Sequence, residues 1–171
     1  MHYQQRRTRQ DGFTLIELLI VTSLTVMLLL TITTMFMTFL VSNSKTNIRK
    51  SVKEEGLHAL SQIEFIIKNA RYYDDTFQAC GTGLNTIRVV GLDGGVTTYS
   101  TSNGKIASNS ATLNSNLTSD AVTLSGLTFD CSGDTGNRQI KVTFSLSKNA
   151  PTLSADSVIS EPFETLINMR N

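Results

Sequence analysis

The chain divides into a strongly apolar front and a polar remainder. Residues 13–41 are almost continuously apolar, and no charged residue occurs between Glu17 and Lys45. An apolar segment longer than about 20 residues can cross the roughly 30 Å hydrocarbon core of a membrane as a helix. Residues 13–41 are therefore predicted to form one transmembrane helix, because the apolar run of a cleaved secretory signal would be shorter.

The helical pattern continues beyond the apolar run, through residues 42–73. At 100° per residue, one arc of about 120° collects nearly all of the apolar and small residues of this stretch, as in an amphipathic helix. They are Ile48, Val52, Gly56, Ala59, Leu60, Ile63, Ile66, Ile67 and Ala70. With no proline before Pro151, a single helix is expected from Phe13 to about Tyr73.

Several residues of this stretch need separate interpretations. Gly56 lies inside the apolar stripe, where glycine costs up to about 1 kcal/mol relative to alanine, so a strand is expected to approach it closely, with a hinge as the alternative. Leu57, Phe65 and Tyr72 lie off the stripe and are either singly exposed or in contact with another subunit. His58 has no partner at ligand spacing and is interpreted as solvated.

After Tyr73 the sequence changes to short β-rich runs separated by Gly, Asn, Asp and Ser. The predicted strands are residues 86–92, 95–101, 105–108, 121–130 and 139–147. Asn103-Gly104 predicts a tight hairpin turn, because both residues accept positive φ angles. The alternation between Ile140 and Ser147 predicts a strand whose apolar side covers the helix stripe.

The remaining segments complete the predicted fold. Residues 108–120 and 148–160 have few apolar residues and are predicted to be loops, whereas residues 161–171 regain apolar residues and are expected to form a last strand or turn. A long N-terminal helix followed by short strands indicates the α+β class, with the helix packed on a small antiparallel sheet.

Composition excludes several classes of function. Fifteen basic and 14 acidic residues give a net charge of +1, so a polybasic nucleic-acid reader is excluded and no specific nucleic acid is predicted. The chain has two histidines, no Gly-rich phosphate loop and no metal-binding His motif, so no enzyme, cofactor or metal is predicted. Acids near turns are interpreted as turn residues and not as calcium ligands, because they lack EF-hand spacing. They are Asp74, Asp75, Asp93, Asp130 and Asp134.

The charges that flank the span leave its orientation open. Three arginines lie in residues 1–12 and four cations in residues 45–53, so a count of basic residues favours neither direction. Glu17 is the one charge in the span. A charged side chain costs about 2.5–3.5 kcal/mol at mid-bilayer on insertion scales, so Glu17 is a candidate functional residue.

These features together resemble a known leader. A basic leader, Gly12-Phe13-Thr14-Leu15-Ile16-Glu17 and the following apolar run resemble the class III leader of type IV pilins and type II secretion pseudopilins. The resemblance implies that prepilin peptidase cuts after Gly12, that the new amino terminus at Phe13 is methylated, and that Glu17 acts in subunit docking. It also implies a type IV pilin-like fold. The expected parts are a leader (1–12), a transmembrane half-helix (13–41), an amphipathic half-helix (42–73) and a β-rich head (74–171).

The resemblance also implies a location and partners. We expect a single pass through the cytoplasmic membrane with the head outside, followed by incorporation into a pilus or pseudopilus. The expected partners are other pilin or pseudopilin subunits, prepilin peptidase, a membrane assembly platform and the lipid bilayer. Thr33 and Thr34 occupy a region where major pilins often have proline, which favours a minor subunit. The alternative is a membrane-anchored binding module that does not polymerise.

Cleavage would give Glu17 a partner. The new ammonium at Phe13 would lie one helical turn from the Glu17 carboxylate, at the edge of a low-dielectric slab where an ion pair is screened little. Glu17 could bind its own terminus or that of a neighbouring subunit. We favour the intermolecular pair as the hypothesis, because it would set the axial register of a filament.

The two cysteines, Cys80 and Cys131, both fall in the expected exported head. An oxidising compartment favours a disulfide between them, and closing the intervening loop should contribute about 4 kcal/mol in the chain-entropy model. A metal pair is disfavoured, because neither cysteine has a second ligand at the spacing of a structural site.

Overall fold

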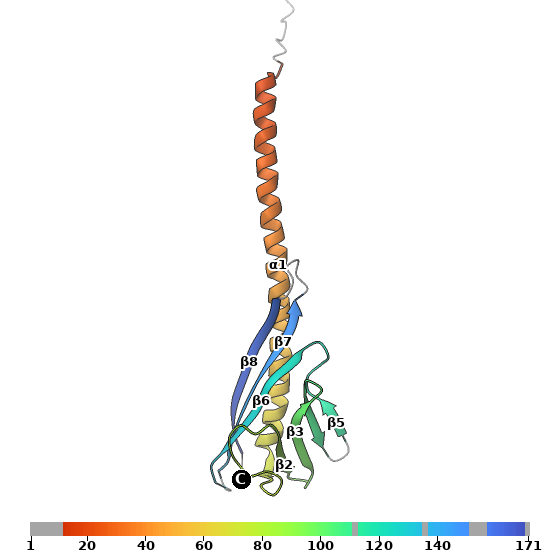
Figure 1. Cartoon of the computed structure of the whole chain (residues 1–171), viewed down its shortest axis with the longest axis vertical. Coiled ribbons are helices and arrows are strands. Elements are labelled where there is room, and N and C mark those ends of the chain that lie inside the picture. Colours follow the sequence, from red (N-terminus) through yellow and green to blue (C-terminus); the bar gives the residue numbers. More distant parts are fainter. Residues whose placement is uncertain (1–11, 111–112, 135–136, 151–156, 170–171) are drawn as a thin grey trace, which may run out of the picture. The chain divides into compact units, whose positions relative to one another are not determined.

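The computed structural model describes residues 12–110, 113–134, 137–150 and 157–169. The chain forms two compact units, Met1–Ser42 and Asn43–Asn171, and each is described by itself. One long N-terminal helix is followed by antiparallel strands, so the predicted α+β, pilin-like class is confirmed (Figure 1).

Helix α1 (Leu15–Lys68) contributes residues to both units. It begins after Thr14, whose hydroxyl oxygen accepts a hydrogen bond from the N–H of Glu17 at 3.3 Å. This bond satisfies one of the free N–H groups of the first turn. From its start to Gly56 the helix contains neither glycine nor proline, so nothing in the sequence interrupts the backbone hydrogen bonds.

The C-terminal end of α1 differs from the prediction. The helix ends at Lys68 and not near Tyr73, and Ala70–Tyr73 form strand β1. Just after this end, the side-chain amide of Asn69 donates to the carbonyl of Phe65 at 2.7 Å, alongside the backbone N–H of Asn69 at 3.2 Å. The following residues then pair with a neighbouring strand, a tertiary contact that overrides the helical pattern.

The larger sheet of the second unit has five antiparallel strands in the order β1-β2-β3-β4-β5. Its strands after β1 are β2 (Ile87–Gly91), β3 (Val96–Ser102), β4 (Lys105–Ser110) and β5 (Leu113–Asn116). The predicted turn joins β3 to β4, with positive φ values of 51° at Asn103 and 69° at Gly104. β5 lies in a predicted loop. All four of its residues are exposed, so no apolar alternation marked it as a strand.

A second sheet has three antiparallel strands in the order β6-β7-β8. They are β6 (Thr123–Ser132), β7 (Gln139–Ala150) and β8 (Ser157–Asn168). The prediction of one small sheet was therefore incomplete, and β8 includes residues that were predicted to be a loop.

Proline within β8 is explained by the free edge of this strand. Backbone groups in an antiparallel pair point alternately toward and away from the partner strand. The β7–β8 register runs without a bulge, and the N–H of Met169 donates to the carbonyl of Arg138 at 2.9 Å. Odd-numbered residues of β8 therefore face β7, so Pro162 lies on the outer edge, where no N–H is needed.

The core of the second unit lies between α1 and the two sheets. Figure 1 shows β6, β7 and β8 running along the part of the helix that belongs to this unit. The predicted apolar side of β7 is buried, and so is most of the predicted helix stripe, whose Ile48, Leu60 and Ile66 are half-buried. The fully buried members of both faces are Val52, Ala59, Ile63, Ile67, Ile140, Val142, Phe144 and Leu146.

Gly56 is the point of closest approach between helix and sheet. A Cβ atom at this position would overlap the ring of Phe163 in β8. That ring is buried and stacks on the ring of Phe144, with 5.2 Å between centroids. The expected close approach of a strand to Gly56 is therefore confirmed, and α1 continues through this residue without a break.

Candidate functional site

The predicted processing site lies just before the helix. Gly12 and Phe13 precede α1, and the Phe13 side chain is 85% exposed. Thr14 caps the helix and Glu17 lies in its first turn. The pattern Thr-x-x-Glu is that of a capping box, which is a local signal in the sequence.

Glu17 is exposed on the first turn. A carboxylate is favourable there, because the first turn carries the positive end of the helix dipole. Within the described part of the chain its carboxylate forms no ion pair. The structure therefore keeps Gly12, Phe13 and Glu17 within one short segment and leaves the acid without a cationic partner from its own described residues.

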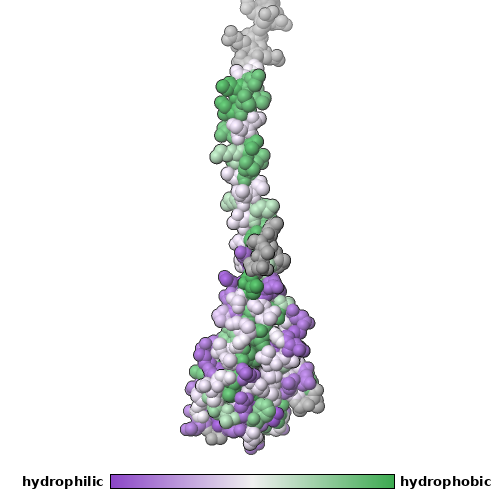
Figure 2. Space-filling model, viewed as in Figure 1, coloured by the Kyte–Doolittle hydropathy of each residue, from purple (hydrophilic) through white to green (hydrophobic). Residues whose placement is uncertain are grey.

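The helix of the first unit has a predominantly apolar and uncovered surface. Every large apolar side chain from Phe13 to Leu40 is exposed, and Figure 2 shows hydrophobic residues recurring along this helix. α1 is long and apolar enough to cross a membrane, and none of its most apolar 18-residue stretch is buried. Soluble monomers rarely expose so large an apolar surface, so this helix requires lipid or protein around it.

The Ser and Thr residues of this segment are compatible with an apolar environment. Each Ser or Thr hydroxyl from Thr22 to Thr38 donates to a backbone carbonyl three or four residues earlier, at 2.6–3.0 Å. These bonds satisfy the hydroxyl protons without water, as a membrane interior requires. The residues are Thr22, Ser23, Thr25, Thr31, Thr33, Thr34 and Thr38.

In the second unit, Cys80 and Cys131 form a disulfide, with their Cα atoms 5.1 Å apart. The bond joins the segment after β1 to strand β6. Backbone hydrogen bonds reinforce this junction, because Cys131 donates to the carbonyl of Gly81 at 2.7 Å, and Leu84 and Phe129 exchange bonds of 2.9 and 2.8 Å.

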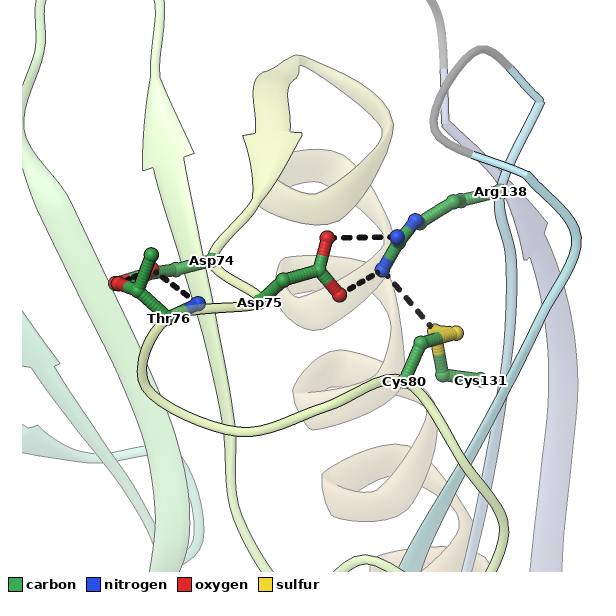
Figure 3. A network of polar contacts seen from close by, with 6 residues as sticks. All are labelled: Asp74, Asp75, Thr76, Cys80, Cys131 and Arg138. Atoms are coloured by element: carbon green, nitrogen blue, oxygen red, sulfur yellow. Dashed lines mark hydrogen bonds and ion pairs between the residues drawn. A yellow bond between two sulfur atoms is a disulfide. The ribbon is translucent and has the colours of Figure 1, made fainter.

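An arginine clamp lies beside the disulfide (Figure 3). Arg138 donates to both carboxylate oxygens of Asp75, at 2.7 and 2.6 Å, and lies 3.9 Å from the sulfur of Cys131. Its guanidinium also lies over the ring of Tyr73, 5.1 Å from the centroid. Burial, with the nearby Asp75 charge, raises the pKa of Tyr73 above its usual value. The clamp holds the loop after β1 against the second sheet.

Of the acids considered as calcium ligands, Asp74 and Asp93 serve turns, Asp75 pairs with Arg138, and Asp130 bonds across to Gly83. Asp74, Asp93 and Asp130 each accept a backbone N–H, and the hydrogen bond from the Thr76 hydroxyl lowers the pKa of Asp74. Among the residues that the structure describes, no group of three or more His, Cys, Asp or Glu could hold a metal ion. The carboxylates and their N–H donors are Asp74 with Thr76 at 3.2 Å, Asp93 with Gly95 at 2.9 Å and Asp130 with Gly83 at 2.7 Å.

Comparison with known proteins gives one match, at the N-terminus. The prokaryotic N-terminal methylation motif matches residues 7–36, a stretch that contains Gly12, Phe13, Glu17 and most of the apolar run. Neither the curated proteins nor the solved structures give a significant match. The chain therefore bears, at residues 7–36, the N-terminal signature of the type IV pilin and pseudopilin family of prepilin-peptidase substrates.

Proposed function

We propose that the chain is a structural subunit, a minor pilin or pseudopilin, that is built into a type IV pilus or a type II secretion pseudopilus. The observation that carries this proposal is the methylation motif together with the helical segment it begins, whose large apolar side chains are all exposed from Phe13 to Leu40. Such a surface is covered by lipid before assembly and by other subunits in a filament core. Because lipid tails are as apolar as these side chains, the move from lipid to filament core removes little surface from water, and packing between helices replaces packing against lipid.

In this proposal the leader, residues 1–12, is removed on the cytoplasmic side and Phe13 becomes the methylated amino terminus. Residues 13–41 cross the cytoplasmic membrane once, and the head (74–171) lies outside the cytoplasm. The disulfide supports this location, because such bonds persist in oxidising compartments. Prepilin peptidase and a membrane assembly platform are the proposed partners, and the chain performs no catalysis.

Glu17 would guide docking. Its carboxylate has no cationic partner in the described part of its own chain, whereas a neighbouring subunit would offer the ammonium of Phe13. In the apolar interior of a filament each charge would need the other, because an unpaired buried charge is costly. This pairing would make the axial register of neighbouring subunits a consequence of charge neutralisation.

The first prediction concerns the mature amino terminus. When the chain is expressed with prepilin peptidase, intact-mass and amino-terminal analysis of the membrane fraction should find a chain that begins at methylated Phe13. Gly12→Leu is the matched control and should keep Met1 and the leader. An exported wild-type chain that still begins at Met1 would instead favour the membrane-anchored binding module, because a plain anchor has no reason to lose its leader.

The second prediction concerns Glu17. Glu17→Gln should leave membrane insertion intact and lower the amount of chain in sheared filaments by more than about tenfold, because leaving one buried charge without its partner costs about 3–5 kcal/mol. Immunoblots of membrane and filament fractions measure both quantities. Glu64→Gln, which removes an exposed acid on the same helix, should assemble normally. Wild-type levels of Glu17→Gln in filaments would refute the docking role.

A further inference from the structure

The second unit begins with a strongly basic surface. No acidic residue occurs between Glu17 and Glu54, whereas four cations lie in residues 45–53. All four are exposed, and hydrophilic residues gather where this unit begins (Figure 2). A half-buried lysine of β7 joins them, with its amine 3.5 Å from the hydroxyl of Ser51. The set, named here the basic collar, is Lys45, Arg49, Lys50, Lys53 and Lys148.

The acids that face the collar only partly neutralise it. Glu161 of β8, whose side chain is 16% exposed, lies 2.7 Å from Arg49 and 3.8 Å from Lys53. Glu54 lies 3.8 Å from Lys50, and both of these side chains are largely exposed. Two carboxylates thus face five cations.

A third acid, Glu55, lies nearby, and counting its charge still leaves three carboxylates against the five cations of the collar. Glu55 accepts hydrogen bonds from the hydroxyl and N–H of Ser119, at 2.7 and 3.2 Å. In the described part of the chain, no ion pair involves Lys45 or Lys148. The collar therefore keeps a net positive charge that the described residues do not balance.

The position of the collar in the sequence indicates what balances this charge. Lys45 follows Val41, the end of the apolar run, by only four residues. The polar headgroup layer extends about 5–8 Å beyond each side of the hydrocarbon core, and a helix rises 1.5 Å per residue. Lysine and arginine side chains are long enough to extend along a helix toward such a layer. From Val41 the helix rises about 6 Å to Lys45, about 12 Å to Arg49 and about 13.5 Å to Lys50. The side chains of these three residues, extended back along the helix, come within reach of lipid phosphates, whereas Lys53 lies about one turn farther out.

We propose that the basic collar binds the phosphate groups of anionic lipids in the outer leaflet of the membrane that residues 13–41 cross. This inference rests on the proposed function only for the membrane span and its orientation. Basic residues beside a span resist translocation, so a collar on the translocated side works against the insertion that the leader arginines favour. Lipid binding gives these cations a use, because they hold the head at the membrane until the subunit leaves for a filament.

The test measures lipid selectivity on the full chain. The protein is reconstituted in vesicles of four parts phosphatidylcholine to one part phosphatidylglycerol, with either lipid spin-labelled in trace amount. Electron paramagnetic resonance then gives the fraction of each lipid that is immobilised at the protein. We expect phosphatidylglycerol to be preferred about fivefold for each collar cation that contacts a headgroup. Equal association of the two lipids would overturn the proposal.

The variants separate the collar from other charges. Lys45→Gln/Lys50→Gln should lower the preference relative to the wild type by about fivefold for each lysine that contacts a headgroup. The variant spares Arg49 and Lys53, which hold Glu161 against the helix. The matched control removes two lysines from outside the collar, Lys68→Gln/Lys141→Gln, and should keep the preference. The leader arginines are present in the wild type and in both variants, so their contribution to the lipid preference is the same in all three. Full selectivity in the collar variant, or an equal loss in both variants, would overturn the proposal.

Two further comparisons distinguish lipid phosphate from free phosphate, and separate this proposal from the proposed function. Inorganic phosphate should displace the labelled lipid no more than sodium chloride of equal ionic strength, and a stronger displacement would indicate a site for free phosphate instead. The measurement requires neither cleavage nor assembly. A chain that keeps its leader and forms no filament would therefore refute the proposed function and leave the lipid preference to be judged on its own result.

Discussion

Removing the disulfide should destabilise the head by about 4 kcal/mol. Cys80 and Cys131 are 51 residues apart in the sequence. In the chain-entropy model, closing a loop of that length stabilises the folded state by this free energy, because it lowers the entropy of the unfolded chain. The variant that tests this is Cys80→Ala/Cys131→Ala, which leaves no unpaired thiol. The native head should persist, because backbone bonds between residues 81–84 and 129–131 still join the two segments.

Urea unfolding of the full chain in detergent would measure this loss, followed by near-ultraviolet circular dichroism of the tyrosines. The wild type in excess dithiothreitol should unfold at the same urea concentration as the double variant, and dithiothreitol should not affect the variant itself. A double variant as stable as the oxidised wild type would show that the disulfide adds nothing to the stability of the head.

Replacing Gly56 with leucine should destabilise the head by about 3 kcal/mol, although leucine is the better helix former. Even a Cβ at this position would overlap the ring of Phe163. The ring has little freedom to move, because it is buried and stacked on Phe144. Overpacking should therefore exceed the gain in helix propensity, and the same urea titration would measure the difference.

In a control background that lacks the Phe163 ring, Gly56→Leu should stabilise the head instead of destabilising it. Phe163→Ala alone should cost about 3–5 kcal/mol through the cavity it leaves. Adding Gly56→Leu to that variant should recover part of the loss, because the leucine side chain enters the space of the ring. If Gly56→Leu destabilised both backgrounds equally, its cost would arise within the helix and not from contact with β8.

Several elements of this protein were readable from local patterns. The processing motif lies in one continuous stretch around Gly12, and the same stretch identifies Glu17 as the one acid of the span. The helix stripe around Ile63 and the alternation of β7 predicted which faces are buried, because helices and strands have fixed periods of 3.6 and 2 residues. Asn103-Gly104 located a hairpin by its backbone preferences alone.

Other elements depend on partners that are distant in the sequence. The end of α1 at Lys68 depends on pairing between β1 and β2, and β5 is a strand because it adds to the edge of β4, although its own side chains are exposed. The later part of β8, within residues 161–171, was predicted as a last strand or turn, whereas residues 157–160 fell in a predicted loop and form the first part of β8 through the long register with β7. A strand of this kind gains its stability from its neighbours, so its own residues carry only a weak signal.

The same division holds for the candidate sites. The motif from Gly12 to Glu17 and the excess of cations in residues 45–53 are local, so composition and spacing reveal both. The clamp between Asp75 and Arg138, the contact of Phe163 with Gly56 and the pairing of Glu161 with the collar join residues from separate elements. No periodicity within one segment encodes such contacts, because they arise only when folding brings the helix and the loop after β1 against the second sheet.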